Sequence, residues 1–182
     1  RIFVQGAMQQ TSNTLDMAIN GAGFFQIQMP DGTVGYTRDG AFQLDAQGQV
    51  VTANGFPLQP GLTIPPTAQL VTIGQDGTVT AKVPGQVAPQ NVGSIQLVQF
   101  VNPQGLQSLG NNLFAESAAS GTPNPNTPGT NGLGLLNQGY VEASNVNVVE
   151  ELVNMIQTQR AYEINSKSIQ TSDQMLARIS QL

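Results

Sequence analysis

The chain has 182 residues, of which 39% are hydrophobic and 9% are charged, and 11 acidic against 6 basic side chains give a net charge of −5. It contains no cysteine or histidine, which excludes zinc sites built from thiolates or imidazoles, redox dithiols, and Ser-His or Cys-His nucleophile pairs. The six basic residues are scattered, so no basic patch is available to neutralise nucleic-acid phosphates.

The polar character of the chain comes from uncharged amides, because 23 glutamines and 15 asparagines outnumber the 17 charged side chains. A weakly charged surface offers little electrostatic repulsion between copies, which indicates an assembly subunit. No apolar run approaches the roughly 18 residues of a membrane span, and no cleavable signal peptide is recognisable. The sequence begins at Arg1 and not at Met, so we expect a native N-terminal segment to precede it.

Residues 1–119 are expected to form a β-rich body, either a meander or a barrel-like domain. Short alternating apolar runs are separated there by four turn dipeptides. They are Asp31-Gly32, Asp39-Gly40, Asn54-Gly55 and Asp76-Gly77. Glycine adopts positive φ freely and Asp or Asn tolerates it, so such dipeptides between apolar runs favour a chain reversal. The sequence therefore predicts a turn, and no helix, at all four positions.

Residues 120–139 are expected to form an exposed loop or linker. The first thirteen of them contain three prolines and three glycines. Proline cannot donate to a β-ladder and glycine weakens regular structure, so this composition favours an irregular connection. The predicted boundary between the body and the C-terminal part of the chain therefore falls here.

Residues 140–182 are expected to contain one long amphipathic helix of the coiled-coil type, starting near Asn147 and free of glycine and proline to Ser180. Asn147 is a candidate N-cap, with Glu150 three residues later. Apolar residues recur at steps of three or four, which places them on one stripe of the helix. We predict that this stripe is an assembly interface. Its members are Val146, Val149, Val153, Ile156, Arg160, Ile164, Met175 and Ile179.

Four aspartates raise the question of a catalytic or metal site. A glycosidase uses two carboxylates, and Ca²⁺ prefers clustered carboxylates. Turn chemistry is the stronger interpretation, because each aspartate lies in a predicted turn where its side chain can accept backbone N–H groups. They are Asp31, Asp39, Asp45 and Asp76. We therefore predict no catalytic residue, no cofactor, no metal and no small-molecule substrate.

Seven passages resemble the bacterial flagellar rod and hook axial proteins. They are residues 15–27 (LDMAINGAGFFQI), 36–40 (YTRDG), 52–55 (TANG), 110–114 (GNNLF), 144–151 (SNVNVVEE), 159–163 (QRAYE) and 165–167 (NSK). The resemblance spans nearly the whole chain and is greatest to the distal-rod members of that family. The resemblance implies an N-terminal helix ahead of the position of Arg1, and we expect the predicted C-terminal helix to pair with it in the full-length protein.

The resemblance implies a structural role and no enzyme activity. Members leave the cytoplasm through the flagellar type III export apparatus without a cleaved signal. They polymerise in the periplasm as a helical tube that transmits motor torque to the hook. The implied partners are further copies of the chain, the proximal rod proteins, the hook protein, and the ring proteins of the peptidoglycan and outer membrane.

Three alternatives stay open from the sequence. The chain could be a proximal rod or a hook-type axial protein. It could also be a cell-surface or phage-tail β binding module with a helical stalk, although a stalk should show a sustained seven-residue repeat. A carbohydrate-active enzyme would require two aspartates that converge in one cleft.

Overall fold

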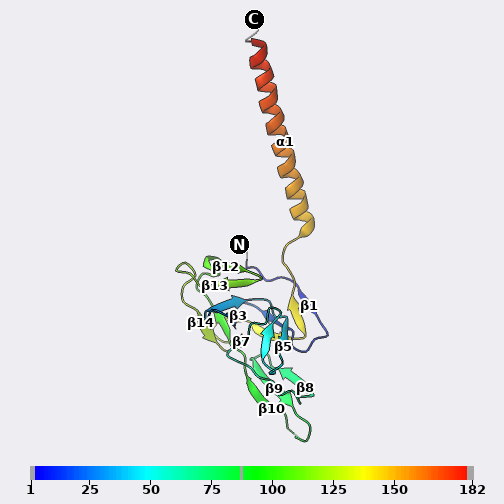
Figure 1. The fold of residues 1–182 in the computed structure, drawn as a ribbon, viewed down its shortest axis with the longest axis vertical. Coiled ribbons are helices and arrows are strands. Elements are labelled where there is room, and N and C mark those ends of the chain that lie inside the picture. Colours follow the sequence, from blue (N-terminus) through cyan, green and yellow to red (C-terminus); the bar gives the residue numbers. More distant parts are fainter. Residues whose placement is uncertain (1–2, 87, 180–182) are drawn as a thin grey trace. The chain divides into compact units, whose positions relative to one another are not determined.

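The computed structural model describes residues 3–86 and 88–179, with helix side chains described up to Met175. The chain divides into a β-rich unit that ends at Ser144 and a helical unit that starts at Asn145 (Figure 1). The prediction of a mainly β protein with one long C-terminal helix is confirmed. The strands form meander-like antiparallel sheets, and across the described residues they do not close into a barrel.

The largest sheet has seven strands. Six follow in the order β12 (Gln107–Gly110), β13 (Leu113–Ala115), β4 (Val34–Thr37), β3 (Phe24–Gln28), β11 (Leu97–Gln99) and β14 (Asn124–Asn126), and β7 (Leu58–Gln59) also pairs with β3. A 3₁₀ turn, η1 (Pro103–Gly105), connects β11 to β12. Every pairing in this sheet is antiparallel.

Four smaller antiparallel sheets complete the β-rich unit. They are β10 (Gln90–Ser94) with β9 (Thr78–Lys82) and β8 (Leu70–Ile73), β15 (Leu135–Gln138) with β2 (Met17–Asn20), β5 (Phe42–Leu44) with β6 (Val50–Thr52), and β1 (Met8–Gln10) with β16 (Tyr140–Glu142). The helical unit consists of α1 (Val148–Ile179).

The two faces of β3 serve two different cores. Successive side chains of a strand point to opposite faces, so neighbouring phenylalanines separate. Phe25 joins the main core and packs edge-on against Phe42, with ring centroids 5.1 Å apart. Phe24 joins a smaller aromatic cluster, in which Tyr36 and Phe100 have ring centroids 4.8 Å apart. Strand β3 therefore contributes side chains to both the main core and the aromatic cluster, and it connects the two.

Three of the four predicted turns are confirmed as chain reversals. Gly32 closes the hairpin between β3 and β4, and Gly77 closes the hairpin between β8 and β9. Gly55 lies in a turn in which its N–H donates to the carbonyl of Thr52. All three glycines have φ between 81° and 84°, the left-handed region that glycine enters without strain.

The fourth dipeptide, Asp39-Gly40, works differently. The strands on either side of it, β4 and β5, belong to different sheets, so it does not close a hairpin. Gly40 has no positive φ, but its carbonyl accepts the Met17 N–H at 3.0 Å. A Cβ at this position would lie 1.6 Å from the Met17 carbonyl oxygen. Glycine is needed here for close backbone approach and not for turn geometry.

Residues 120–139, expected as an exposed loop or linker, lie within the β-rich unit. β14 pairs with β11, and β15 pairs with β2 over four residues. Leu133 and Leu136 are buried in the main core. The backbone pairing and these two leucines anchor the segment despite its prolines and glycines, and Pro125 is tolerated because β14 is an edge strand.

We predict that Gly40→Ala destabilises the protein by about 1 to 3 kcal/mol, because the added methyl group overlaps the Met17 carbonyl and forces two sheets apart. Urea unfolding followed by circular dichroism measures the change. Gly61→Ala is the control, since nothing lies within 4 Å of its added Cβ and its φ is not positive. Equal stability of the two variants would contradict the close-approach explanation.

Candidate functional site

The helix α1 begins as its sequence predicts. The Asn147 Oδ1 accepts the Val149 N–H at 3.1 Å, and the Asn147 carbonyl accepts the Glu151 N–H at 3.0 Å. Glu150 and Glu151 place negative charge in the first turn, where the helix dipole favours it. The 32 residues of α1 span about 48 Å at 1.5 Å per residue.

Most of the predicted interface residues share one side of α1. A rotation of about 100° per residue places Val149, Val153, Ile156, Arg160, Ile164 and Met175 within an arc of about 100°. The five apolar members are 46 to 68% exposed, and Arg160 is also exposed. Val146 precedes the helix, and the Ile179 side chain lies outside the described residues. We call the six helical positions the predicted stripe.

A second apolar row on α1 was missed by the sequence analysis. It contains Val148, Leu152, Met155, Tyr162 and Ile169, all at least 51% exposed. Helical rotation places these residues on a different side from the predicted stripe. The detectable signal was a seven-residue spacing from Val148 through Met155 and Tyr162 to Ile169. A helix with two apolar sides is suited to contacts with more than one neighbour.

The side chains of the four aspartates considered in the sequence bond to their local backbone, as predicted. Asp31 Oδ1 accepts the Thr33 hydroxyl at 2.6 Å and the Thr33 N–H at 2.9 Å. The hydroxyl hydrogen bond, followed by the backbone one, lowers the pKa of Asp31, and Thr78 lowers the pKa of Asp76 in the same way. Asp39 and Asp45 also accept backbone N–H groups two residues later. Within residues 3–86 and 88–179, no cluster of three or more acidic side chains could hold a metal ion.

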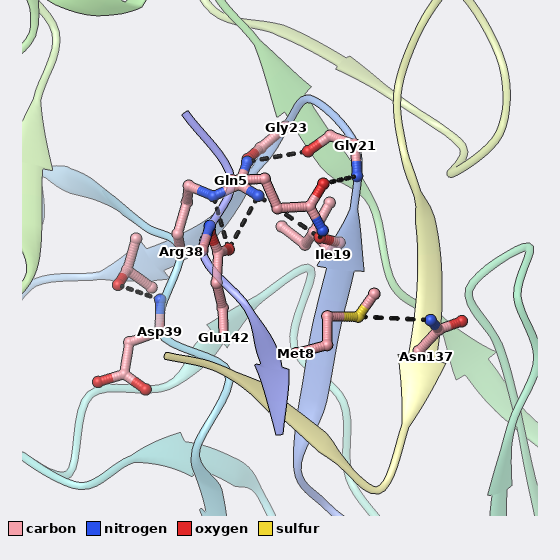
Figure 2. A network of polar contacts seen from close by, with 11 residues as sticks. Gln5, Met8, Ile19, Gly21, Gly23, Arg38, Asp39, Asn137 and Glu142 are labelled. Carbon is pink, nitrogen blue, oxygen red and sulfur yellow. Dashed lines mark hydrogen bonds and ion pairs between the residues drawn. The ribbon is translucent and has the colours of Figure 1, made fainter. Parts of the chain in front are cut away.

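Arg38, next to the end of β4, makes several polar contacts within the body (Figure 2). Its guanidinium donates to the Glu142 carboxylate at 2.9 Å, and it also donates to the carbonyls of Gly21 and Gly23 at 3.1 and 3.0 Å. The side chains of Arg38 and Glu142 are only 17% and 12% exposed. Partial burial strengthens the pair, since water screens it less than a surface pair.

The first described residues of the chain are tied to the same network. Gln5 donates to the Ile19 carbonyl at 3.2 Å and accepts the Gly21 N–H at 3.1 Å. Gly6 donates its N–H to the second Glu142 carboxylate oxygen at 2.8 Å. Because β1 pairs with β16, the chain start and the strand that leads toward α1 are held together. We call this cluster of Gln5, Gly6, Arg38 and Glu142 the junction.

Comparison with known proteins gives the family. Residues 18–81 match the family "Flagellar hook protein FlgE/F/G D1 domain", and residues 137–182 match "Flagellar basal body rod FlgEFG protein C-terminal". The flagellar basal-body rod protein FlgG of Buchnera aphidicola subsp. Schizaphis graminum is 59% identical over 182 residues, which is the whole of this chain and 70% of that protein. The FlgG proteins of Caulobacter vibrioides and Bacillus subtilis are 50% and 43% identical over the whole chain, also covering 70% of each relative.

The chain belongs to the flagellar basal-body rod protein family. Its role is structural, in the distal rod of the bacterial flagellar basal body. The two matched regions contain the two features described above: Arg38 lies in the first, and Glu142 and α1 lie in the second. No helix among the described residues is both long enough and apolar enough to cross a membrane.

We predict that Arg38→Met destabilises the protein by about 3 kcal/mol, because it leaves the largely buried Glu142 carboxylate without its ion pair. Adding Glu142→Leu should restore part of the lost stability, since the unpaired charge is then removed. Urea unfolding measures both variants. Lys82→Met is the control, because Lys82 is exposed and its loss should cost less than about 0.5 kcal/mol. A loss no larger than that of the control would contradict the role of the junction.

Proposed function

We propose that α1 is the assembly element through which copies of this chain polymerise into a helical tube that transmits motor torque to the hook. The observation that carries this proposal is that ten large hydrophobic residues are exposed on two sides of α1 among the side chains described from Val148 to Met175. Burial of one Val or Ile contributes about 1.5 to 3 kcal/mol. The four Val and Ile residues of the predicted stripe therefore contribute roughly 6 to 12 kcal/mol before ordering costs.

The predicted stripe is proposed to pair with the N-terminal helix that the family resemblance implies. Support comes from the β-rich unit, where the Ala143 N–H donates to the Ala7 carbonyl at 2.8 Å. The first strand, β1, and the strand that leads to α1, β16, are thus held side by side. The second apolar row, which includes Met155 and Tyr162, then stays available for helices of neighbouring copies.

The β-rich unit is proposed to carry torque as a rigid body. Its sheets are connected through shared cores, and the junction fixes the strand that leads into the helical unit. The largely buried ion pair between Arg38 and Glu142, 104 positions apart in the chain, resists sliding of one sheet against another. A stiff subunit transmits torque without deforming, whereas an enzyme often has to open to admit its substrate.

We propose that the chain acts in the periplasm after export through the flagellar type III apparatus without a cleaved signal. Its neighbours are proximal rod proteins, the hook protein and the ring proteins of the peptidoglycan and outer membrane. Support comes from membership of a basal-body family and from a chain without cysteine, which is compatible with an oxidising compartment. We further propose that it has no enzymatic activity, because its aspartates bond to their own turns.

We predict that Val153→Asp or Ile156→Asp abolishes polymerisation of the full-length protein and leaves the β-rich unit folded. A carboxylate in an apolar seam loses its hydration without gaining a partner. Asn154→Asp is the matched control, because it adds the same charge to the same exposed helix on neither apolar side. Sedimentation measures polymer, and circular dichroism measures folding. Polymer formation by Val153→Asp and Ile156→Asp at the wild-type concentration would contradict the role of α1.

A further inference from the structure

The first described residues of the chain form a strap on the β-rich unit. Residues 3–7 form no strand, and they are partly buried or exposed. They lead into β1, which pairs with β16 over three residues. Because this pair is antiparallel, the chain ahead of β1 and the chain after β16 leave it at the same end. A force that separates these two segments would therefore break the hydrogen bonds of the ladder one after another and not all together.

An aromatic ring attaches the strap to a different part of the unit. The Phe3 ring packs edge-on against Phe24 in β3 and Phe114 in β13, with ring centroids 5.6 and 5.3 Å apart. Such edge-on pairs are favourable beyond the burial of their area. The buried members of this aromatic cluster are Phe24, Tyr36, Val98, Phe100 and Leu106. Phe3 is only partly buried against them, so it fixes the strap to a cluster whose centre is formed by other residues.

The Gln5 amide attaches the strap to a third segment (Figure 2). Its Nε2 donates to the Ile19 carbonyl at 3.2 Å, and its Oε1 accepts the Gly21 N–H at 3.1 Å. An amide can make both bonds because it carries a donor and an acceptor, whereas a carboxylate can only accept. Ile19 lies in β2 and Gly21 follows that strand, so neither bond depends on the pairing with β16.

We propose that residues 3–7 are a mechanical clasp that prevents β1 from peeling away from β16 when the rod transmits torque. The proposal deepens the proposed function and rests on it, because the load on the clasp comes from the N-terminal helix of that polymer. Phe3 and Gln5 bear the load first. Their partners lie in β2, β3 and β13 and in the residue after β2, so a pull must dislodge them before it reaches the ladder of β1 and β16.

Hydrogen exchange of the unassembled full-length protein, resolved by residue, tests the clasp. Phe3→Ala and Gln5→Glu should each increase exchange of the Ala143 N–H, which donates to the Ala7 carbonyl, by about tenfold, because local opening becomes easier. Exchange of the amides in β3 and β13 should stay at the wild-type rate. The second substitution keeps the size of the side chain and removes the donor to the Ile19 carbonyl.

Two control variants separate the clasp from general destabilisation. Phe56→Ala removes a ring that is also partly buried but packs against the main core. Gln9→Glu adds the same charge at an exposed position of β1. Neither should change exchange at Ala143. An equal increase throughout β3 and β13 in Phe3→Ala would show that Phe3 only fills the aromatic cluster, and it overturns the proposal. An unchanged Ala143 rate in both clasp variants does so as well.

A disulfide across the ladder tests whether the clasp stays closed in the rod. Ala7 and Ala143 lie one position beyond the Met8–Glu142 pair, and antiparallel partners have Cα atoms about 4.5 to 5.5 Å apart, which a disulfide can bridge. The chain has no native cysteine, so Ala7→Cys with Ala143→Cys forms a defined lock. Cells carrying Phe3→Ala should lose swimming speed relative to the wild type as medium viscosity, and with it the load, rises. The oxidised lock should restore that speed, and Ala143→Cys alone should not.

The swimming assay can also contradict the clasp. Wild-type speed of Phe3→Ala at every viscosity overturns the proposal, because the ladder then bears the load without its anchor. A locked protein that is folded but forms no rods overturns it too, since the strap would have to open during assembly. Failure of the proposed function is a different result, in which Val153→Asp forms rods like the wild type. That result leaves the exchange rates of the unassembled clasp variants unchanged.

Discussion

The ion pair between Arg38 and Glu142 is the constraint on which the arrangement of the β-rich unit depends. Arg38 brings together the carbonyls of Gly21 and Gly23 and a carboxylate 104 residues later in the chain. A guanidinium can do this because it offers five N–H donors in a fixed plane, whereas lysine offers a single point charge. Its guanidinium also lies over the Phe24 ring, with Cζ 6.0 Å from the ring centroid. Arg38 thus connects the segment from Gly21 to Gly23 with the exit strand, and Glu142 in turn accepts the Gly6 N–H near the start of the chain.

The Arg38–Glu142 ion pair lies where the β-rich unit leads into the helical unit, so it bears on the structural role of the protein. The strand that leads toward α1 ends at Glu142, so the residue that fixes the exit from the body is also the ion-pair partner. The helix α1 combines charged side chains with exposed Val, Ile, Leu and Met side chains, so it can offer neighbouring copies an apolar contact surface.

The turns show how far local chemistry reaches. Asp31-Gly32 and Asp76-Gly77 close hairpins because the glycine φ and the aspartate side-chain bonds are both properties of residues within the turn. Asp39-Gly40 has the same composition, yet its glycine serves a contact with Met17, more than twenty residues earlier. The turn explanation is therefore correct for Asp31-Gly32 and Asp76-Gly77 and wrong for Asp39-Gly40. A hairpin turn depends on residues that are neighbours in sequence, whereas the contact of Gly40 with Met17 depends on the tertiary structure.

The sequence by itself determined the class of fold, the start of α1 at its Asn147 cap, the predicted stripe, and the absence of thiol and imidazole chemistry, because these follow from residue type and local periodicity. Only the tertiary structure decided that residues 120–139 pair with β2 and β11 and that Arg38 meets Glu142. Each of these depends on segments distant in the chain that become neighbours only when the sheets pack, and no local pattern encodes that proximity.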